Sequence, residues 1–147
     1  MQDSSSQRLI LVLQANPDHQ QLIQTVLAQS ELRPQGVAIA TTHAALDYLL
    51  RRGDYPTAPR PDLILLDLDL PGELSGPALL ARIKAEPALR RIPTVVLTLS
   101  EHPDDIFSTY VAQGNCYVVK PSDRDRLTQI IRRIEEFWLS IVTLPQE

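Results

Sequence analysis

The stretch that decides the fold is Leu-Ile-Leu-Leu-Asp at residues 63–67, which runs directly into Leu-Asp-Leu-Pro-Gly at residues 68–72. Four consecutive apolar residues that end in an acid are typical of a strand buried on both faces of a parallel sheet. Ligand sites of open parallel sheets lie at the carboxyl ends of their strands. The sequence therefore places Asp67 at the edge of the sheet where an α/β protein does its chemistry.

Strand-like apolar runs alternate with helix-like segments five times along the chain. We expect strands at residues 9–13, 37–40, 63–66, 93–98 and 116–119. We expect a helix after each strand: the first begins at Asn16-Pro17, the second is capped by Thr42, the third begins at Ser75, the fourth begins at Pro103 and the fifth is capped by Ser122. The fourth should end at Ala112 before Gly114, and the fifth near Trp138. Five such βα units predict a parallel sheet with helices on both faces.

Length, charge and cysteine content narrow the class of protein. The chain has 147 residues, enough for one domain, and its net charge of −4 gives no electrostatic case for nucleic-acid binding. It has no apolar run long enough for a membrane helix and no signal-peptide core, so we expect a cytoplasmic protein. Cys116 is the only cysteine, which excludes an intrachain disulfide. We expect a disordered leader at 1–7, one domain at 8–138 and a C-terminal extension at 139–147.

Two later strand ends supply partners for the acid. Thr98 closes the fourth expected strand and Lys120 follows the fifth, so a hydroxyl and an ammonium should meet Asp67 above the sheet. This set suits phosphoryl chemistry on a carboxylate, because the carboxylate is the nucleophile, the ammonium balances phosphoryl charge and the hydroxyl donates to a phosphoryl oxygen.

Three motifs connect the chain with a known family. They are Leu-Leu-Asp-Leu-Asp-Leu-Pro at residues 65–71 with Gly76 five residues on, Pro-Thr-Val-Val-Leu-Thr at 93–98, and Tyr-Val-Val-Lys-Pro at 117–121. With them the chain resembles the response-regulator receiver domains of two-component systems, from residue 9 to about residue 138. The resemblance implies a flavodoxin-like α/β fold, a doubly wound five-stranded parallel sheet in the order 2-1-3-4-5 with five helices.

The resemblance also implies roles for single residues. Asp67 takes the phospho-acceptor position, and Thr98 is the switch hydroxyl that moves toward a phosphate. Tyr117 is the rotating aromatic whose pose reports the switch, and Lys120 is the site lysine with a following cis bond to Pro121. Such a protein is not an enzyme beyond self-phosphorylation and dephosphorylation at Asp67.

Further segments look like the small stand-alone receivers that are paired with cyanobacterial phytochromes. They are residues 60–67, 91–93, 115–117 and 137–145. This likeness implies a sensor histidine kinase of phytochrome type, or a relay protein, as partner. It also implies a homodimer whose docking surface uses the fourth and fifth helices and the C-terminal extension, with Phe137, Trp138 and Leu139 at the interface.

The pattern breaks after the first strand. Receivers hold Mg²⁺ there with a pair of acids, together with the phospho-acceptor and a backbone carbonyl, which is that of Asp69 here. This chain has Gln14 and Ala15 at the two acid positions, and Asn-Pro-Asp at 16–18 fixes the alignment. Because Mg²⁺ is held by carboxylates in near-octahedral geometry, we expect its binding and phosphotransfer to Asp67 to be strongly weakened or lost. Other acids nearby in sequence are candidate substitutes: Asp18, Asp69 and Glu73.

Loss of the acid pair has a second consequence. Clustered carboxylates repel one another, and without that repulsion Lys120 can pair with Asp67 in the absence of a metal. We therefore predict a Lys120–Asp67 ion pair that locks the site in one state. The histidines are far apart in sequence and look like solvated surface residues: His19, His43 and His102.

Two other functions share part of this pattern. A haloacid-dehalogenase-like phosphatase would use Asp67 and Asp69 as its Asp-x-Asp signature, but its nucleophile strand should come first, and here two strands precede it. A flavin-binding flavodoxin-like domain would need a phosphate loop rich in glycine and hydroxyl groups after the first strand. Residues 14–17, Gln-Ala-Asn-Pro, are a poor substitute for that loop.

Overall fold

The computed structural model describes residues 7–111 and 116–138 of the chain. The element order is β1 (Leu9–Leu13), α1 (Pro17–Gln29), β2 (Gln35–Ile39), α2 (Thr42–Leu50), β3 (Leu63–Leu66), α3 (Gly76–Ala85), β4 (Thr94–Thr98), α4 (Pro103–Val111), β5 (Cys116–Val119) and α5 (Arg124–Glu136). All strand pairs are parallel, and the sheet order is β2-β1-β3-β4-β5. This confirms the predicted fold class and strand order.

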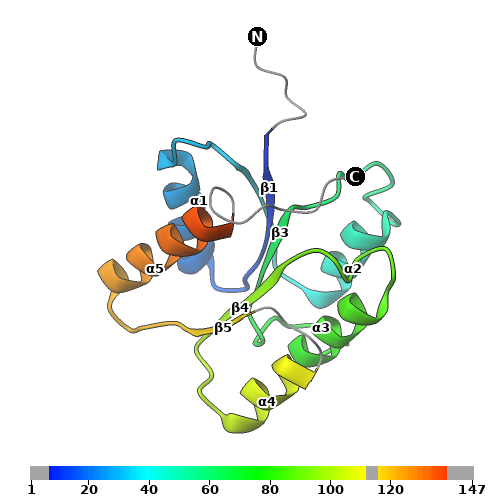
Figure 1. Ribbon diagram of the computed structural model, residues 1–147. Coiled ribbons are helices and arrows are strands. Elements are labelled where there is room, and N and C mark those ends of the chain that lie inside the picture. The colour runs from blue at the N-terminus through cyan, green and yellow to red at the C-terminus, as the bar shows by residue number, and fades with distance from the viewer. Residues whose placement is uncertain (1–6, 112–115, 139–147) are drawn as a thin grey trace.

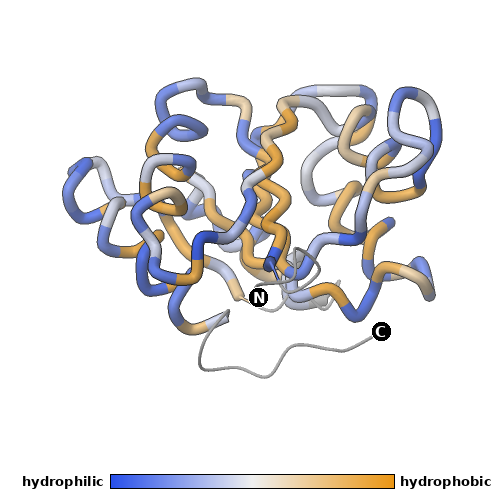
Figure 2. The backbone as a smooth tube through the Cα atoms, turned by 90° about the horizontal axis from the view of Figure 1, so that it is seen from above, coloured by the Kyte–Doolittle hydropathy of each residue, from blue (hydrophilic) through white to orange (hydrophobic). Residues whose placement is uncertain are grey.

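Helices cover both faces of the sheet (Figure 1). Helices α1 and α5 lie on one face, and α2, α3 and α4 lie on the other. Every residue of β1, β3 and β4 is buried, so these three strands form the centre of the molecule, whereas the edge strand β2 is partly exposed. Figure 2 shows the same arrangement from above, with the most apolar stretches of backbone running through the middle.

The two apolar clusters explain why the strands read as continuous apolar runs. Side chains alternate between the two faces along a strand. In β3, Leu63 and Leu65 therefore pack under α1 and α5, while Ile64 and Leu66 pack under α2 and α3. A strand with a helix layer on each side has no polar face, which is the reason for the sequence pattern at 63–66.

Two predicted helix caps are wrong by one residue. Thr41, not Thr42, caps α2, because its hydroxyl accepts the Ala44 N–H, at 3.2 Å. The Thr42 backbone N–H instead donates to the Pro71 carbonyl, at 2.8 Å. Asp123, not Ser122, caps α5, because its carboxylate accepts the Asp125 N–H, at 2.9 Å.

Smaller differences concern strand ends and the peptide bond after Lys120. The second strand spans 35–39 rather than 37–40 because its pairing with β1 extends back to Leu9, and the fourth begins at 94 rather than 93. The bond before Pro121 is trans, and the described residues include no cis bond, so the expected cis bond is wrong. The trans isomer is lower in energy by roughly 0.5–1 kcal/mol, and Lys120 reaches Asp67 from it.

Some expectations fall on residues that the structure does not describe. They are the leader up to residue 6, the end of the fourth helix at Ala112 with Gly114, and the extension at 139–147 with Leu139. Within residues 7–111 and 116–138, no helix combines the length and the apolarity needed to cross a membrane.

Candidate functional site

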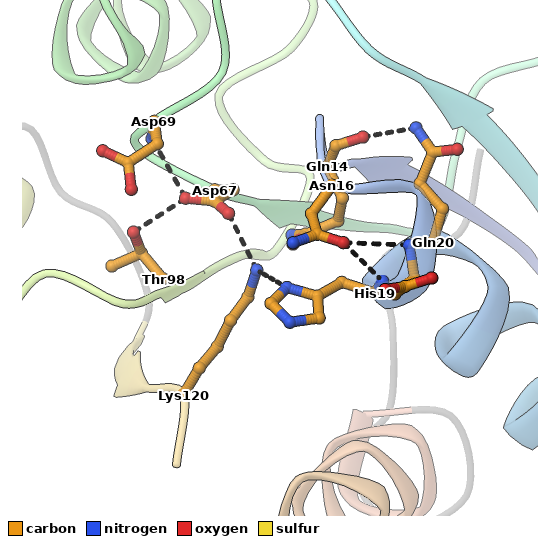
Figure 3. Close-up of polar contacts among 9 residues, drawn as sticks. Gln14, Asn16, His19, Gln20, Asp67, Asp69, Thr98 and Lys120 are labelled. Atoms are coloured by element: carbon orange, nitrogen blue, oxygen red, sulfur yellow. Dashed lines mark hydrogen bonds and ion pairs between the residues drawn. The ribbon is translucent and has the colours of Figure 1, made fainter. Parts of the chain in front are cut away.

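The ends of three neighbouring strands bring together the predicted carboxylate, hydroxyl and ammonium (Figure 3). Thr98 Oγ1 donates to Asp67 Oδ1 at 2.7 Å, and Lys120 Nζ donates to Asp67 Oδ2 at 2.8 Å. The side chains of the ion pair are almost inaccessible, with 1% of Lys120 and 7% of Asp67 exposed. The predicted Lys120–Asp67 ion pair is therefore present, and it is buried.

Backbone pairing sets this geometry. Thr98 is the last residue of β4, and its carbonyl accepts the Lys120 N–H at 2.7 Å, which continues the ladder between β4 and β5 by one residue. On the other side, the Asp67 N–H donates to the Leu13 carbonyl of β1, at 2.9 Å. The three side chains therefore project from adjacent strands at the same level of the sheet.

The loop after β3 adds a third donor to the carboxylate. The Asp69 backbone N–H donates to Asp67 Oδ1 at 3.0 Å, and the Leu70 N–H donates to the Asp67 carbonyl at 3.1 Å. This tight turn packs against the start of α3 at Gly76. A Cβ at Gly76 would lie less than 3.0 Å from the backbone of Leu68, so glycine is required for the close approach.

The end of β1 has no charge. Gln14 is completely buried, and neither its side-chain nitrogen nor its side-chain oxygen has a hydrogen-bond partner in the described part of the chain. Its backbone carbonyl accepts the side-chain amide of Gln20. Ala15 packs against the core on the α2–α3 face. The two positions where the resemblance predicts acids, 14 and 15, thus hold a buried amide and a methyl group.

His19 belongs to the site, although we predicted it to be a solvated surface residue. Its Nδ1 lies 2.8 Å from Lys120 Nζ, and the residue is only partly exposed. The Asn16 side chain caps α1 by accepting the N–H groups of Asp18 and His19, which holds the first turn of the helix beside the strand ends. Burial and the Lys120 ammonium lower the pKa of His19 below its ordinary value of 6.5, and they outweigh the opposing effect of Asp67.

Sequence reasoning missed His19 because nothing in the local pattern distinguishes it from His43 or His102. The available signal was its place in the first turn of a helix that follows β1, since that turn faces the carboxyl edge of the sheet.

The aromatic residues singled out in the sequence lie elsewhere. The Tyr117 hydroxyl donates to the Ser100 carbonyl at 2.8 Å, its ring is half-buried against the core, and burial raises its pKa. Trp138 packs partly against the core on the α1–α5 face, whereas Phe137 is 47% exposed, and their rings are in edge-to-face contact. Leu139 lies outside the described residues.

The side chains at this site do not fit a divalent cation. Mg²⁺ takes carboxylate and other oxygen ligands in an octahedron. Asp67 is the buried carboxylate at these strand ends, and both of its oxygens already accept hydrogen bonds within the chain. The other buried carboxylate in the described residues, Glu135 of α5, accepts from the Ser30 hydroxyl instead. In residues 7–111 and 116–138, no three acid, histidine or cysteine side chains are grouped so that they could hold a metal.

Comparisons with known proteins agree with the geometry. Residues 10–132 match the response regulator receiver domain family. Response regulator Rcp1 of Synechocystis sp. is 39% identical over 143 residues, which cover 97% of each chain. A crystal structure of the phosphorylated cyanobacterial phytochrome response regulator RcpA is 44% identical, with a TM-score of 0.92 over 95% of this chain and 99% of that one. The Mn²⁺-bound form of Rcp1 is 40% identical, with a TM-score of 0.91 over the same shares.

Proposed function

Because the chain belongs to the response regulator receiver domain family, it acts in two-component signal transduction, and we propose that it does so as a receiver whose Mg²⁺-dependent phosphorylation at Asp67 is weakened or lost. Its output is then a protein–protein contact. Membership of this family leaves the phosphatase and flavin-binding alternatives without support.

One observation carries this proposal. Both oxygens of Asp67 are engaged by Lys120, Thr98 and the backbone of the β3–α3 loop, while the opposite wall of the site holds a neutral amide. Phosphoryl transfer to a carboxylate develops negative charge that Mg²⁺ normally neutralises. Among the residues that contact Asp67, the positive charge is that of Lys120, which already balances the Asp67 carboxylate.

Asp67 therefore keeps the acceptor position without the usual metal ligands around it. We place any self-phosphorylation and dephosphorylation at Asp67. In this proposal Thr98 is the switch hydroxyl, and Tyr117 is the aromatic residue whose pose changes with it. The hydrogen bond from Tyr117 to Ser100, between β4 and α4, supports this placement, because it links the aromatic ring to the segment that follows Thr98.

The partner we propose is a sensor histidine kinase of phytochrome type or a relay protein. The likeness to RcpA and Rcp1 along almost the whole chain supports this choice. The surface formed by α4, β5 and α5 supports contacts with a partner or with a second copy, because large apolar side chains are exposed on α4 and at the end of α5: Phe107, Tyr110 and Phe137. We propose a homodimer that uses this surface with Phe137, Trp138 and Leu139.

A titration with Mg²⁺ and beryllofluoride, a phosphoryl mimic, tests the proposal. Fluorescence of Trp138 and the tyrosines reports binding in the wild type, in Asp67→Asn and in the double variant Gln14→Glu/Ala15→Asp. We expect no saturable response from the wild type and a Mg²⁺-dependent response from the double variant, which regains the acid pair. A saturable wild-type response that is lost in Asp67→Asn would overturn the proposal and show a working phospho-switch.

A further inference from the structure

The Lys120 ammonium has an acceptor on each side. It lies between Asp67 Oδ2 and His19 Nδ1, at 2.8 Å from each, and Figure 3 shows the imidazole on the side away from Thr98. An ammonium has donors only. His19 Nδ1 must therefore be the acceptor, so the ring is neutral and its proton is on Nε2.

The second acceptor comes from a helix, since no side-chain atom at the end of β1 is bonded to the ammonium. The Gln14 amide has no partner in the described part of the chain, and Ala15 has no polar side-chain atom. His19 reaches the ammonium from the first turn of α1, which Asn16 holds in place through two backbone hydrogen bonds. Asp67, Lys120 and His19 thus form a continuous bridge from β3 through β5 to α1.

We propose that His19 is a positioning residue that, as a neutral acceptor, holds the Lys120 ammonium on Asp67 and ties α1 to the strand ends, and that a proton on Nδ1 breaks this tie. The inference rests on the proposed function in one respect. The contact of His19 with Lys120 matters for the site only where Lys120, and not a metal ion, balances the charge of Asp67.

The charges around the imidazole ring determine how readily His19 takes up a proton and loses its contact with Lys120. Four charged groups act on His19: Lys120 from the end of β5, Asp67 from the end of β3, Asp18 from α1 and Arg124 from α5. Burial, Lys120 and Arg124 oppose protonation, whereas Asp67 and Asp18 favour it. Protonated Nδ1 would place two cations in contact, and because His19 is the more exposed of the two, its side chain is the one that leaves.

The first test uses the wild-type protein alone. Nitrogen-15 NMR of the imidazole ring distinguishes the two neutral tautomers. We expect the His19 signal at neutral pH to show a protonated Nε2 and an unprotonated Nδ1. A protonated Nδ1 would overturn the proposal, because that nitrogen could not then accept from Lys120.

The second test is the pKa of His19 in two variants. In Lys120→Met the pKa should rise, since a neighbouring cation has gone, and in Asp67→Asn it should fall, since a neighbouring anion has gone. A histidine beyond the reach of both charges would not show opposite shifts, and the tautomer and rescue tests separate a hydrogen-bonded imidazole from one that is merely close. An unchanged pKa in Lys120→Met would overturn the proposal, and if that variant does not fold, the wild-type tautomer still decides.

The third test is rescue by a neutral acceptor. His19→Gln keeps an acceptor oxygen on a flexible side chain, whereas His19→Leu removes it. We expect hydrogen exchange of the Lys120 ammonium, followed by NMR, to be several-fold faster in His19→Leu and close to wild type in His19→Gln. His43→Leu is the matched control, since the His43 side chain is 74% exposed and bridges to Asp47 within α2. Equal exchange rates in both His19 variants would overturn the proposal.

None of these measurements uses Mg²⁺ or a phosphoryl mimic, so they separate the two proposals. A wild-type response to beryllofluoride would reject the proposed function and leave the His19–Lys120 contact standing. The wrong tautomer would reject that contact and leave the proposed function standing.

Discussion

The carboxyl edge of the sheet consists of two parts that satisfy their polar groups in different ways. At the ends of β3, β4 and β5, the polar atoms of Asp67, Thr98 and Lys120 are joined by hydrogen bonds of 2.7–2.8 Å. At the end of β1, the buried Gln14 amide has no partner in the described part of the chain. The comparison shows how the charges of a receiver site balance without a metal ion. One carboxylate, that of Asp67, faces one ammonium, that of Lys120, so the pair carries no net charge.

The largest expected effect comes from breaking the joined part of the site. Lys120→Met leaves the Asp67 carboxylate buried without its counter-charge, and removal of one member of a buried pair costs about 3–5 kcal/mol. We expect a loss of that size in the free energy of unfolding measured with urea.

A double variant tests whether the unpaired charge of Asp67 causes this loss of stability. Asp67→Asn/Lys120→Met has neither charge and should recover at least half of the loss, because no unpaired ion remains. Arg132→Met is the control, since this exposed cation on α5 contacts Gln29 and should cost less than about 0.5 kcal/mol. An additive double variant would mean that the pair is not coupled.

The next effect concerns the loop that presents the carboxylate. Gly76→Ala places a Cβ within 3.0 Å of the Leu68 backbone, which must move, and overpacking of this kind costs about 1–3 kcal/mol. Because Leu68 lies between Asp67 and Asp69, we also expect shifts of the amide signals of both acids in NMR spectra.

Gly36→Ala is the matched control for this variant. Its Cβ would meet the end of the Gln24 side chain first, which can rotate away, so the loss of stability should be smaller. A Gly36→Ala variant that is destabilised more than Gly76→Ala would contradict the requirement for a close approach at Leu68.

The sequence was sufficient to predict the part of the site formed by Asp67, Thr98 and Lys120, but it was not sufficient to predict the contact of His19 with Lys120. Asp67, Thr98 and Lys120 follow apolar runs whose strand character comes from burial on both faces, so their meeting follows from the topology. The contact of His19 with Lys120 joins residues 101 positions apart, and it depends on how the first turn of α1 is oriented. No local pattern carries that orientation.

The helix caps failed for a related reason. Thr41 and Thr42 are the same residue type, and a cap rule based on side-chain chemistry cannot choose between them. The hydrogen bond from the Thr42 backbone to Pro71 makes the choice, and Pro71 belongs to the loop after β3. Tertiary contacts therefore decide the exact helix start.

A smaller effect of opposite sign is expected at the end of β1. Gln14→Leu replaces two buried polar atoms that lack partners with apolar ones of similar volume, and each such atom costs about 1–3 kcal/mol when buried. Allowing for imperfect fit, we expect a gain of about 1 kcal/mol in thermal or urea unfolding. A loss of stability would mean that the Gln14 amide has a partner in solution and that the two parts of the site are less different than the structure indicates.

The smallest effect concerns His19, the residue that links the two parts. Its pKa is lowered in the folded protein, so as the pH falls below about 6.5 the unfolded chain takes up the proton first. The contribution of His19 is therefore fully present above that pH and is lost as the pH falls through the folded pKa. Urea unfolding between pH 8 and pH 5 should show a steeper acid loss for the wild type than for His19→Gln, which cannot take up this proton. Parallel curves would mean that His19 titrates alike in both states, and then it cannot act as the second acceptor that holds Lys120 in place.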